Sequence, residues 1–161
     1  MNKLHTLHFA SPIGNIEIIG TDEAICSIMF TEDVKDSATT GEPTNVLTDC
    51  YQQMTQYFNG ERQEFTFPYV QEGTPFRKIV WAALTKIPYG ETGSYKDLAA
   101  SIENPKAIRA VGSANSKNKL SIVIPCHRII GSTGKLTGYA GGLWRKEWLL
   151  HHEQSFKKEA E

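Results

Sequence analysis

Apolar and polar residues alternate in the first part of the chain, which is the pattern of half-buried β-strands. Residues 4–10 alternate in this way, and so do residues 15–20, with the turn sequence Ser-Pro-Ile-Gly between them. Residues 24–30 are a third strand candidate, rich in β-branched side chains. Strands joined by so short a turn pair side by side, so the pattern predicts a small antiparallel sheet.

A loop and a helix are predicted to follow these strands. Residues 34–44 are rich in Asp, Ser, Thr, Gly and Pro, which is typical of a loop. Residues 45–59 place apolar side chains at helical spacing, and Gly60 ends the predicted helix. Residues 1–73 are therefore predicted to form an α/β module.

The pattern becomes mainly helical from residue 74 onward. Thr74 and Pro75 are typical of an N-cap followed by a proline in the first turn. The helix they begin has one predicted apolar face, made of Phe76, Ile79, Val80, Ala83, Leu84 and Ile87, and Pro88-Tyr89-Gly90 ends it. Residues 141–153 are predicted to form the last helix, and residues 154–161 a frayed tail.

Two short helices in this half resemble a helix-turn-helix. Ser94 to Asp97 reads as a capping box with Asp in place of Glu, and it begins a helix that runs through Ile102. Asn104-Pro105 begins a second helix, which runs to about Asn115 with Ile108, Val111 and Ala114 facing inward. Because many helical domains contain such a pair, this signal is weak by itself. Residues 74–153 are predicted to be a mostly helical second domain.

Charge divides the chain at the same place. Residues 1–75 contain three basic and eleven acidic residues, a net charge of −8. Residues 76–161 contain fourteen basic and seven acidic residues, a net charge of +7, although the whole chain carries only −1. Such asymmetry suggests two modules, of which the basic one faces a polyanion, or alternatively a merely solvated basic surface.

Length and composition exclude several classes of protein. With 161 residues, 40% hydrophobic and 22% charged, the chain is neither disordered nor fibrous, and it allows one domain or two small ones. No apolar run approaches the length of a membrane span, and the N-terminus lacks the pattern of a signal peptide. We therefore expect a soluble, cytoplasmic protein with no membrane partner.

One of the three cysteines stands in a setting that favours chemistry. Cys26 and Cys50 fall on predicted core faces, whereas Cys126 follows Pro125 and precedes His127 and Arg128. Nearby positive charge lowers the pKa of a cysteine and favours its thiolate. On an extended strand Cys126 and His127 would point to opposite faces, so cooperation would need a bend or a bridging water. A buried structural thiol is the alternative. The histidines have no ligand spacing with the cysteines, so no metal is expected.

At this point a resemblance becomes specific. The segments RAVGSAN, IPCHRIIG, LTGYAGG and KEWLLHHE, between Arg109 and Glu153, resemble the O6-alkylguanine-DNA alkyltransferase family. The resemblance covers most of residues 74–153, whereas residues 1–73 are similar only in style. It implies a ribonuclease H-like α/β module followed by a winged helix-turn-helix-like domain. It also implies repair of DNA by irreversible transfer of an alkyl group from O6-alkylguanine to the protein, once per chain, with O4-alkylthymine as a further candidate substrate.

The resemblance also implies roles for individual residues. Cys126 matches the nucleophile, His127 the histidine that takes up the thiol proton through a water, and Glu153 the carboxylate that orients the histidine. Tyr95 matches the tyrosine that reaches guanine N3. The base pocket would be formed by Asn118, Ile129, Tyr139, Ala140 and Gly141, with the carbonyls of Cys126 and Ile129 on the guanine amino group and the Ala140 N–H on O6.

DNA contacts are implied in the same way. Arg109 matches the arginine that fills the stack after the nucleotide is flipped out. The other DNA-binding positions implied are Ser94, Ala107, Ala110, Gly112 and Arg128. Two positions depart from the vertebrate pattern, because Ala140 replaces a serine and Asn115 a methionine, which leaves pocket width open. The partner implied is double-stranded DNA that carries O6-alkylguanine. We expect no cofactor and no metal, and a monomer.

Three other functions remain as alternatives. A cysteine hydrolase could use Cys126, His127 and Glu153, but it would need neither a basic module nor a helix-turn-helix. A damage sensor that binds the lesion without repairing it would lack the nucleophilic cysteine. A helix-turn-helix regulator would ordinarily be a dimer that reads palindromes.

Overall fold

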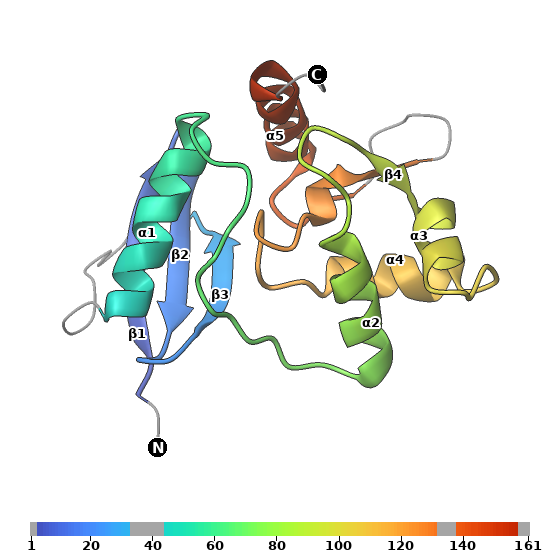
Figure 1. Ribbon diagram of the computed structural model, residues 1–161, viewed down its shortest axis with the longest axis horizontal. Helices are drawn as coiled ribbons and strands as arrows, with labels where there is room; N and C mark the ends of the chain where they lie inside the picture. Colours follow the sequence, from blue (N-terminus) through green and yellow to red (C-terminus); the bar gives the residue numbers. More distant parts are fainter. Residues whose placement is uncertain (1–2, 33–43, 132–137, 158–161) are drawn as a thin grey trace. The chain divides into compact units, whose positions relative to one another are not determined.

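The computed structural model describes residues 3–32, 44–131 and 138–157. The chain divides into two compact units, Met1–Gln71 and Glu72–Glu161 (Figure 1). No helix in the described ranges is long and apolar enough to cross a membrane. The predicted loop at residues 34–44 falls, apart from Thr44, outside the described residues.

The first unit is a three-stranded antiparallel sheet covered by one helix, as the alternating pattern predicts. Strands β1 (His5–Ser11), β2 (Gly14–Gly20) and β3 (Ile25–Phe30) pair in sequence order. Helix α1 (Asn45–Phe58) lies along one face of this sheet (Figure 1). The buried side chains include Phe9, Ile16, Ile18, Ile28, Leu47, Cys50, Met54 and Tyr57. Thr44 caps α1, because its side chain accepts a hydrogen bond from the Leu47 N–H.

The second unit is mainly helical. It contains helices α2 (Pro75–Leu84), α3 (Tyr95–Ser101), α4 (Ile108–Ser116) and α5 (Leu143–Phe156). The predicted caps are present, because Thr74 accepts from the Arg77 N–H and Ser94 forms a reciprocal capping box with Asp97. The sequence did not predict the short parallel pair of β4 (Gly93–Ser94) and β5 (Ile129–Ile130). This pair joins the start of α3 to the segment that follows Cys126.

The buried face of α2 differs from the predicted one. Ile79 is exposed, and Trp81 is buried instead. Trp81 is held in the interior by a hydrogen bond as well as by apolar packing. Its indole N–H donates to the Ala114 carbonyl of α4 at 2.9 Å. Gly73 makes room for this ring, because a Cβ there would lie 2.6 Å from it. The helix also ends at Leu84, earlier than Ile87.

Two other helices have bounds that differ from those expected. Helix α4 begins at Ile108 because residues 104–107 form a turn, closed by the Ala107 N–H on the Asn104 carbonyl. Ile108 is consequently exposed, not inward-facing, whereas Val111 and Ala114 are buried as predicted. Helix α5 continues past Glu153 to Phe156. It is extended because the Gln154 side chain donates to the Gly90 carbonyl and the His152 ring contacts Phe156.

Candidate active site

Cys126 lies on a tight turn. After the buried segment 120–124, Cys126–Arg128 form one turn of 3-10 helix, and the Cys126 N–H donates to the Ile124 carbonyl at 2.7 Å. Pro125 precedes the turn and Ile122, with a φ of 74°, bends the chain just before it. The backbone is therefore bent where an extended strand would have separated Cys126 from His127.

Asn118, two residues beyond the end of α4, organises this turn. Its amide nitrogen lies 3.3 Å from the Cys126 sulfur and 3.0 Å from the Ile124 carbonyl oxygen, to which it donates. Its carbonyl oxygen accepts from the Leu120 N–H at 3.0 Å. Asn118 is buried, so these bonds form out of contact with water. One side chain thus connects the helix-turn-helix segment to the reactive sulfur and to residues 120–124 before it.

We expect Asn118→Ala to destabilise the second unit by about 1–3 kcal/mol, because the Leu120 N–H and the Ile124 carbonyl would lose a buried partner. Denaturant unfolding measures this change. Ser116→Ala, at an exposed position two residues earlier, is the matched control and should stay within about 0.5 kcal/mol of the parent protein. Equal stability of the two variants would show that the Asn118 network contributes nothing.

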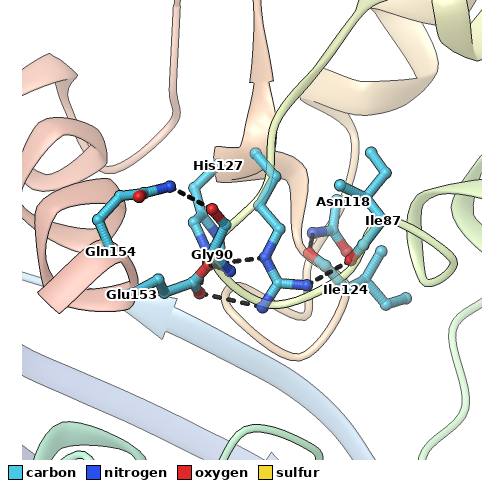
Figure 2. Close-up of polar contacts among 8 residues, drawn as sticks. Ile87, Gly90, Asn118, Ile124, His127, Glu153 and Gln154 are labelled. Carbon is cyan, nitrogen blue, oxygen red and sulfur yellow. Dashed lines mark hydrogen bonds and ion pairs between the residues drawn. The ribbon is translucent and has the colours of Figure 1, made fainter. Parts of the chain in front are cut away.

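Behind the turn, Glu153 of α5 joins His127 to Arg128. The His127 Nε2 and a Glu153 carboxylate oxygen are 2.7 Å apart, and Arg128 donates to both Glu153 oxygens at 2.8 and 3.0 Å. His127 and Glu153 are fully buried. Figure 2 draws Glu153 with dashed contacts at its carboxylate. A carboxylate bound in this way fixes the imidazole ring and its tautomer, since Nε2–H donates to Glu153 and Nδ1 is left as an acceptor.

The same cluster also holds the segment between α2 and β4. Arg128 donates to the Ile87 carbonyl at 2.6 Å, and the Gly90 N–H donates to Glu153 at 3.2 Å. Ile87 and Gly90 are both labelled in Figure 2. Arg128, which was predicted to bind DNA, is instead buried with its guanidinium on Glu153. Glu153 neutralises the positive charge of Arg128 inside the unit, so the guanidinium can be buried.

Burial dominates the electrostatics of the reactive pair. Burial raises the pKa of the Cys126 thiol, while the Asn118 amide and the cationic Lys146 act to lower it. Burial lowers the pKa of His127 and outweighs the opposing effect of Glu153. Burial alone would raise the pKa of Glu153, but His127 and Arg128 hold it well below its usual range. The site at rest therefore holds a neutral thiol beside a neutral imidazole and an ionised carboxylate.

A cavity of about 330 Å³ opens at the Cys126 sulfur. It is lined by Tyr95, Gly112, Asn115, Ser116, Asn118, Ser121, Cys126, Gly138, Tyr139 and Ala140. The structure thus brings six of the predicted site residues to one cavity, from α3, α4, the reactive turn and the segment before α5. Such a volume is within the range of small-molecule sites.

Six other predicted positions are not part of the lining of this cavity. Arg109 and Ala110 are exposed, and Ala107 and Ser94 are half-buried. Ile129 is buried in β5, paired with Gly93 of β4. Gly141 lies just before α5, and its carbonyl accepts from Arg145 at 3.0 Å.

Two cations of α5 were missed by the sequence reasoning. Lys146 is fully buried, and burial lowers its pKa to about 8 while the Cys126 charge acts in the opposite direction. Arg145 is also buried and lies over the Trp144 ring. Lys146, Leu149 and Glu153 are spaced three and four residues apart, so they share one helix face. That spacing, which places a lysine among core positions, was the signal available.

Both units match known families. Residues 75–155 match the family described as "6-O-methylguanine DNA methyltransferase, DNA binding domain", and residues 4–69 match its "ribonuclease-like domain". The chain is 46% identical over 152 residues to a methylated-DNA–protein-cysteine methyltransferase of Methanosarcina acetivorans, covering 91% of this chain and 96% of the relative. It is 43% identical over 156 residues to the constitutive enzyme of that name from Bacillus subtilis, covering 92% and 94%.

Solved structures agree with these sequence matches. The O6-methylguanine methyltransferase of Mycobacterium tuberculosis superposes with a TM-score of 0.85 at 38% identity, covering 98% of this chain and 97% of that one. The structure of Mycobacterium tuberculosis OGT in complex with DNA also gives a TM-score of 0.85, at 40% identity and with 94% and 93% covered. The predicted fold, a small antiparallel sheet module followed by a helical domain, is confirmed.

Proposed function

Because the chain belongs to the 6-O-methylguanine DNA methyltransferase family, we propose that it repairs O6-alkylguanine in DNA by moving the alkyl group onto Cys126. The observation that carries this proposal is the geometry at Cys126: a buried thiol faces a cavity, with the Asn118 amide at its sulfur and the Glu153-held His127 next to it in the chain. The relatives named above are methyltransferases of this kind, and one of the similar structures contains DNA.

The reaction is a single displacement at an sp³ carbon. The Cys126 sulfur forms a bond to the alkyl carbon as the bond between that carbon and guanine O6 breaks. The electron pair of the broken bond passes to the base, which takes up a proton and leaves as ordinary guanine. A thiolate is the attacking form, so the thiol proton must be removed as the substrate binds.

His127 and Glu153 are suited to remove that proton. With Nε2–H directed to Glu153, the Nδ1 atom of His127 carries the lone pair, and it has no hydrogen-bond partner within the described ranges. A bridging water can carry the proton from Cys126 to this nitrogen. The imidazolium that results is stabilised by Glu153, whose carboxylate stays ionised because the cluster lowers its pKa. The positive charge of Lys146 also stabilises the developing thiolate.

The base is proposed to be recognised by groups that line the cavity together with Ile129 and Gly141, which lie outside its lining. Tyr95 donates to guanine N3, the Ala140 N–H donates to O6, and the carbonyls of Cys126 and Ile129 accept from the amino group. Tyr139 provides an aromatic wall of the base pocket. Gly141, which has no side chain, allows the backbone just before α5 to approach the base. In this account Ser94, Ala107, Ala110 and Gly112 contact the DNA backbone, while the small side chains on α4 allow close approach.

A guanine stacked in a duplex cannot reach a buried sulfur, so the nucleotide must be flipped out at a cost of a few kcal/mol. We propose that the exposed Arg109 of α4 fills the space left in the stack. The +7 charge of the second half supplies non-specific affinity for the phosphate backbone. The protein acts on DNA as a monomer without a metal, in the cytoplasm.

Arg109→Ala is expected to slow repair in duplex DNA by about tenfold or more, because no side chain then fills the space that the flipped nucleotide leaves in the base stack. Reaction with free O6-benzylguanine needs no flipping and should change by less than about threefold. The two rates are compared under single-turnover conditions. Lys106→Ala, which removes an exposed charge from the turn before α4, is the control for a loss of phosphate contact alone. Equal losses on the duplex and the free base would show that Arg109 does not take part in flipping.

The alternatives differ in what happens to the protein. A hydrolase would release its acyl group, and a damage sensor would leave the lesion in place. Intact-mass spectrometry after mixing with a short duplex that carries O6-methylguanine distinguishes them: the proposal predicts a protein heavier by one methyl group and a repaired duplex. An unchanged protein mass, with or without loss of the lesion, would reject it.

A further inference from the structure

The cavity at Cys126 contains a buried polar atom that the protein does not satisfy. Asn115 is only 6% exposed, and its side-chain oxygen has no hydrogen-bond partner in the part of the chain that the structure describes. The Tyr139 hydroxyl oxygen is buried as well, with Ser121 as its neighbour. Both Asn115 and Tyr139 line the cavity that holds Cys126. An unmatched amide oxygen and a tyrosine hydroxyl from different segments thus face one small space.

The Asn115 side chain contrasts with that of the neighbouring Asn118. Asn118 is equally buried, but its amide nitrogen and its oxygen are both engaged within the unit. A buried polar group left without a partner destabilises the fold, so such groups are retained where a ligand completes them. The difference between the two asparagines therefore points to Asn115 as a ligand-binding group, not as part of the scaffold.

Asn115 also lies where the alkyl group on guanine O6 is expected, in the cavity that holds Cys126. It lies in the last turn of α4, three residues before Asn118, and both asparagines line the cavity. Asn118 touches the Cys126 sulfur, and Ala140, whose N–H is assigned to guanine O6, lines the same cavity. The polar atoms of the base are already assigned to other groups, so the group left for Asn115 is the substituent on O6.

We propose that Asn115 is a specificity-determining residue that favours O6 substituents bearing a hydroxyl group, of which O6-(2-hydroxyethyl)guanine is the simplest. This proposal rests on the proposed function. A hydroxyl is the group that fits, because it donates to the Asn115 oxygen and still accepts from a donor such as the Tyr139 hydroxyl. An alkyl chain of the same size leaves the Asn115 oxygen unmatched. The hydroxyl lies one carbon away from the carbon that is attacked and remains on the thioether product.

The test uses two substrates of the same shape. O6-(2-hydroxyethyl)guanine and O6-propylguanine, placed in identical duplexes, differ by a hydroxyl in place of a methyl group. The ratio of their single-turnover transfer rates is measured in the parent protein and in Asn115→Leu, which keeps the size of the side chain. We expect the ratio to fall by about five- to tenfold in the variant, the effect of one hydrogen bond. Intrinsic differences between the two substrates cancel in this comparison.

Matched variants separate Asn115 from general effects of mutation. Asn59→Leu makes the same change at an exposed position of the first unit and should keep the parent ratio. Tyr139→Phe should lower the ratio in the same direction as Asn115→Leu, because it removes the second polar atom. If Asn115→Leu does not fold, as judged by thermal unfolding, Asn115→Ala replaces it in the same comparison.

An unchanged ratio in the folded Asn115 variant would overturn this inference. The proposed function fails by a different result, namely that the parent protein transfers no methyl group from O6-methylguanine. The two failures are therefore distinguishable in one set of reactions.

Discussion

Cys126→Ser is expected to abolish alkyl transfer, with a loss of at least about a thousandfold in the single-turnover rate. A serine hydroxyl is a weak nucleophile at neutral pH, and no adjacent base lowers its pKa enough to compensate. The substitution keeps the size of the side chain and the hydrogen bond from Asn118, so the turn should remain folded. The measurement is loss of the alkyl group from O6-methylguanine in a duplex, followed with excess protein.

Cys26→Ser is the matched control for this change. Cys26 is half-buried in β3 of the first unit, where its thiol donates to the Ile19 carbonyl. It should retain the parent rate within about threefold, since a serine hydroxyl can make the same bond. As a second control, Cys126→Ser itself should still bind the duplex, although it does not transfer the alkyl group. Transfer that persists without Cys126, or is lost without Cys26, would contradict the assignment of the nucleophile.

Glu153→Gln is expected to lower both activity and stability. A neutral amide leaves the buried guanidinium of Arg128 without its counter-charge, which costs about 3–5 kcal/mol. It also removes the charge that stabilises the His127 imidazolium, so the transfer rate should fall by about 10²- to 10⁴-fold. Denaturant unfolding measures the first effect, and single-turnover transfer under conditions where the variant is folded measures the second.

The pH dependence of the unfolding free energy tests the same cluster, because the lowered pKa of Glu153 determines whether stability rises or falls in acid. The pKa of Glu153 is lower in the folded protein than the value of about 4.3 expected in the unfolded chain. As the pH falls below that value, the unfolded chain takes up the proton first, so the stability contributed by Glu153 is progressively lost. The parent protein should therefore lose more stability in acid than Glu153→Gln does. Glu147→Gln, at an exposed position of α5, should retain the parent profile and the parent rate.

Local signals in the sequence predicted much of the fold. The alternating residues of the first thirty positions predicted three strands of a small antiparallel sheet, and Thr74 and the Ser94–Asp97 pair marked two helix starts; the structure confirms these predictions. These features depend on neighbours within a few residues. The face of α2 was predicted wrongly, because the partner of Trp81 is a carbonyl of α4, far along the chain. Periodicity alone does not distinguish Trp81 from Ile79.

In the active site, too, features that depend on neighbouring residues were predicted, and contacts between distant residues were not. The sequence around Cys126 marked a reactive cysteine, and the resemblance supplied Glu153 as a partner for His127. Arg128 was placed on the DNA because a basic residue beside a reactive cysteine gives no sign of its own partners. Its contacts are a carboxylate 25 residues later and a carbonyl 41 residues earlier, and only the folded chain brings them together. The buried Lys146 was missed for the same reason.

The central claim is that each chain accepts one alkyl group on Cys126 and then stops. A thioether is not hydrolysed by an activated water, and neither Cys26 nor Cys50 lines the cavity to take the group away. The most direct measurement is a titration of duplex that carries O6-methylguanine against the protein, with repaired guanines counted per chain and the methyl group located by peptide mapping. One product per chain with the methyl group on Cys126 is the predicted result. More than one product per chain, or a methyl group on Cys26 or Cys50, would contradict it.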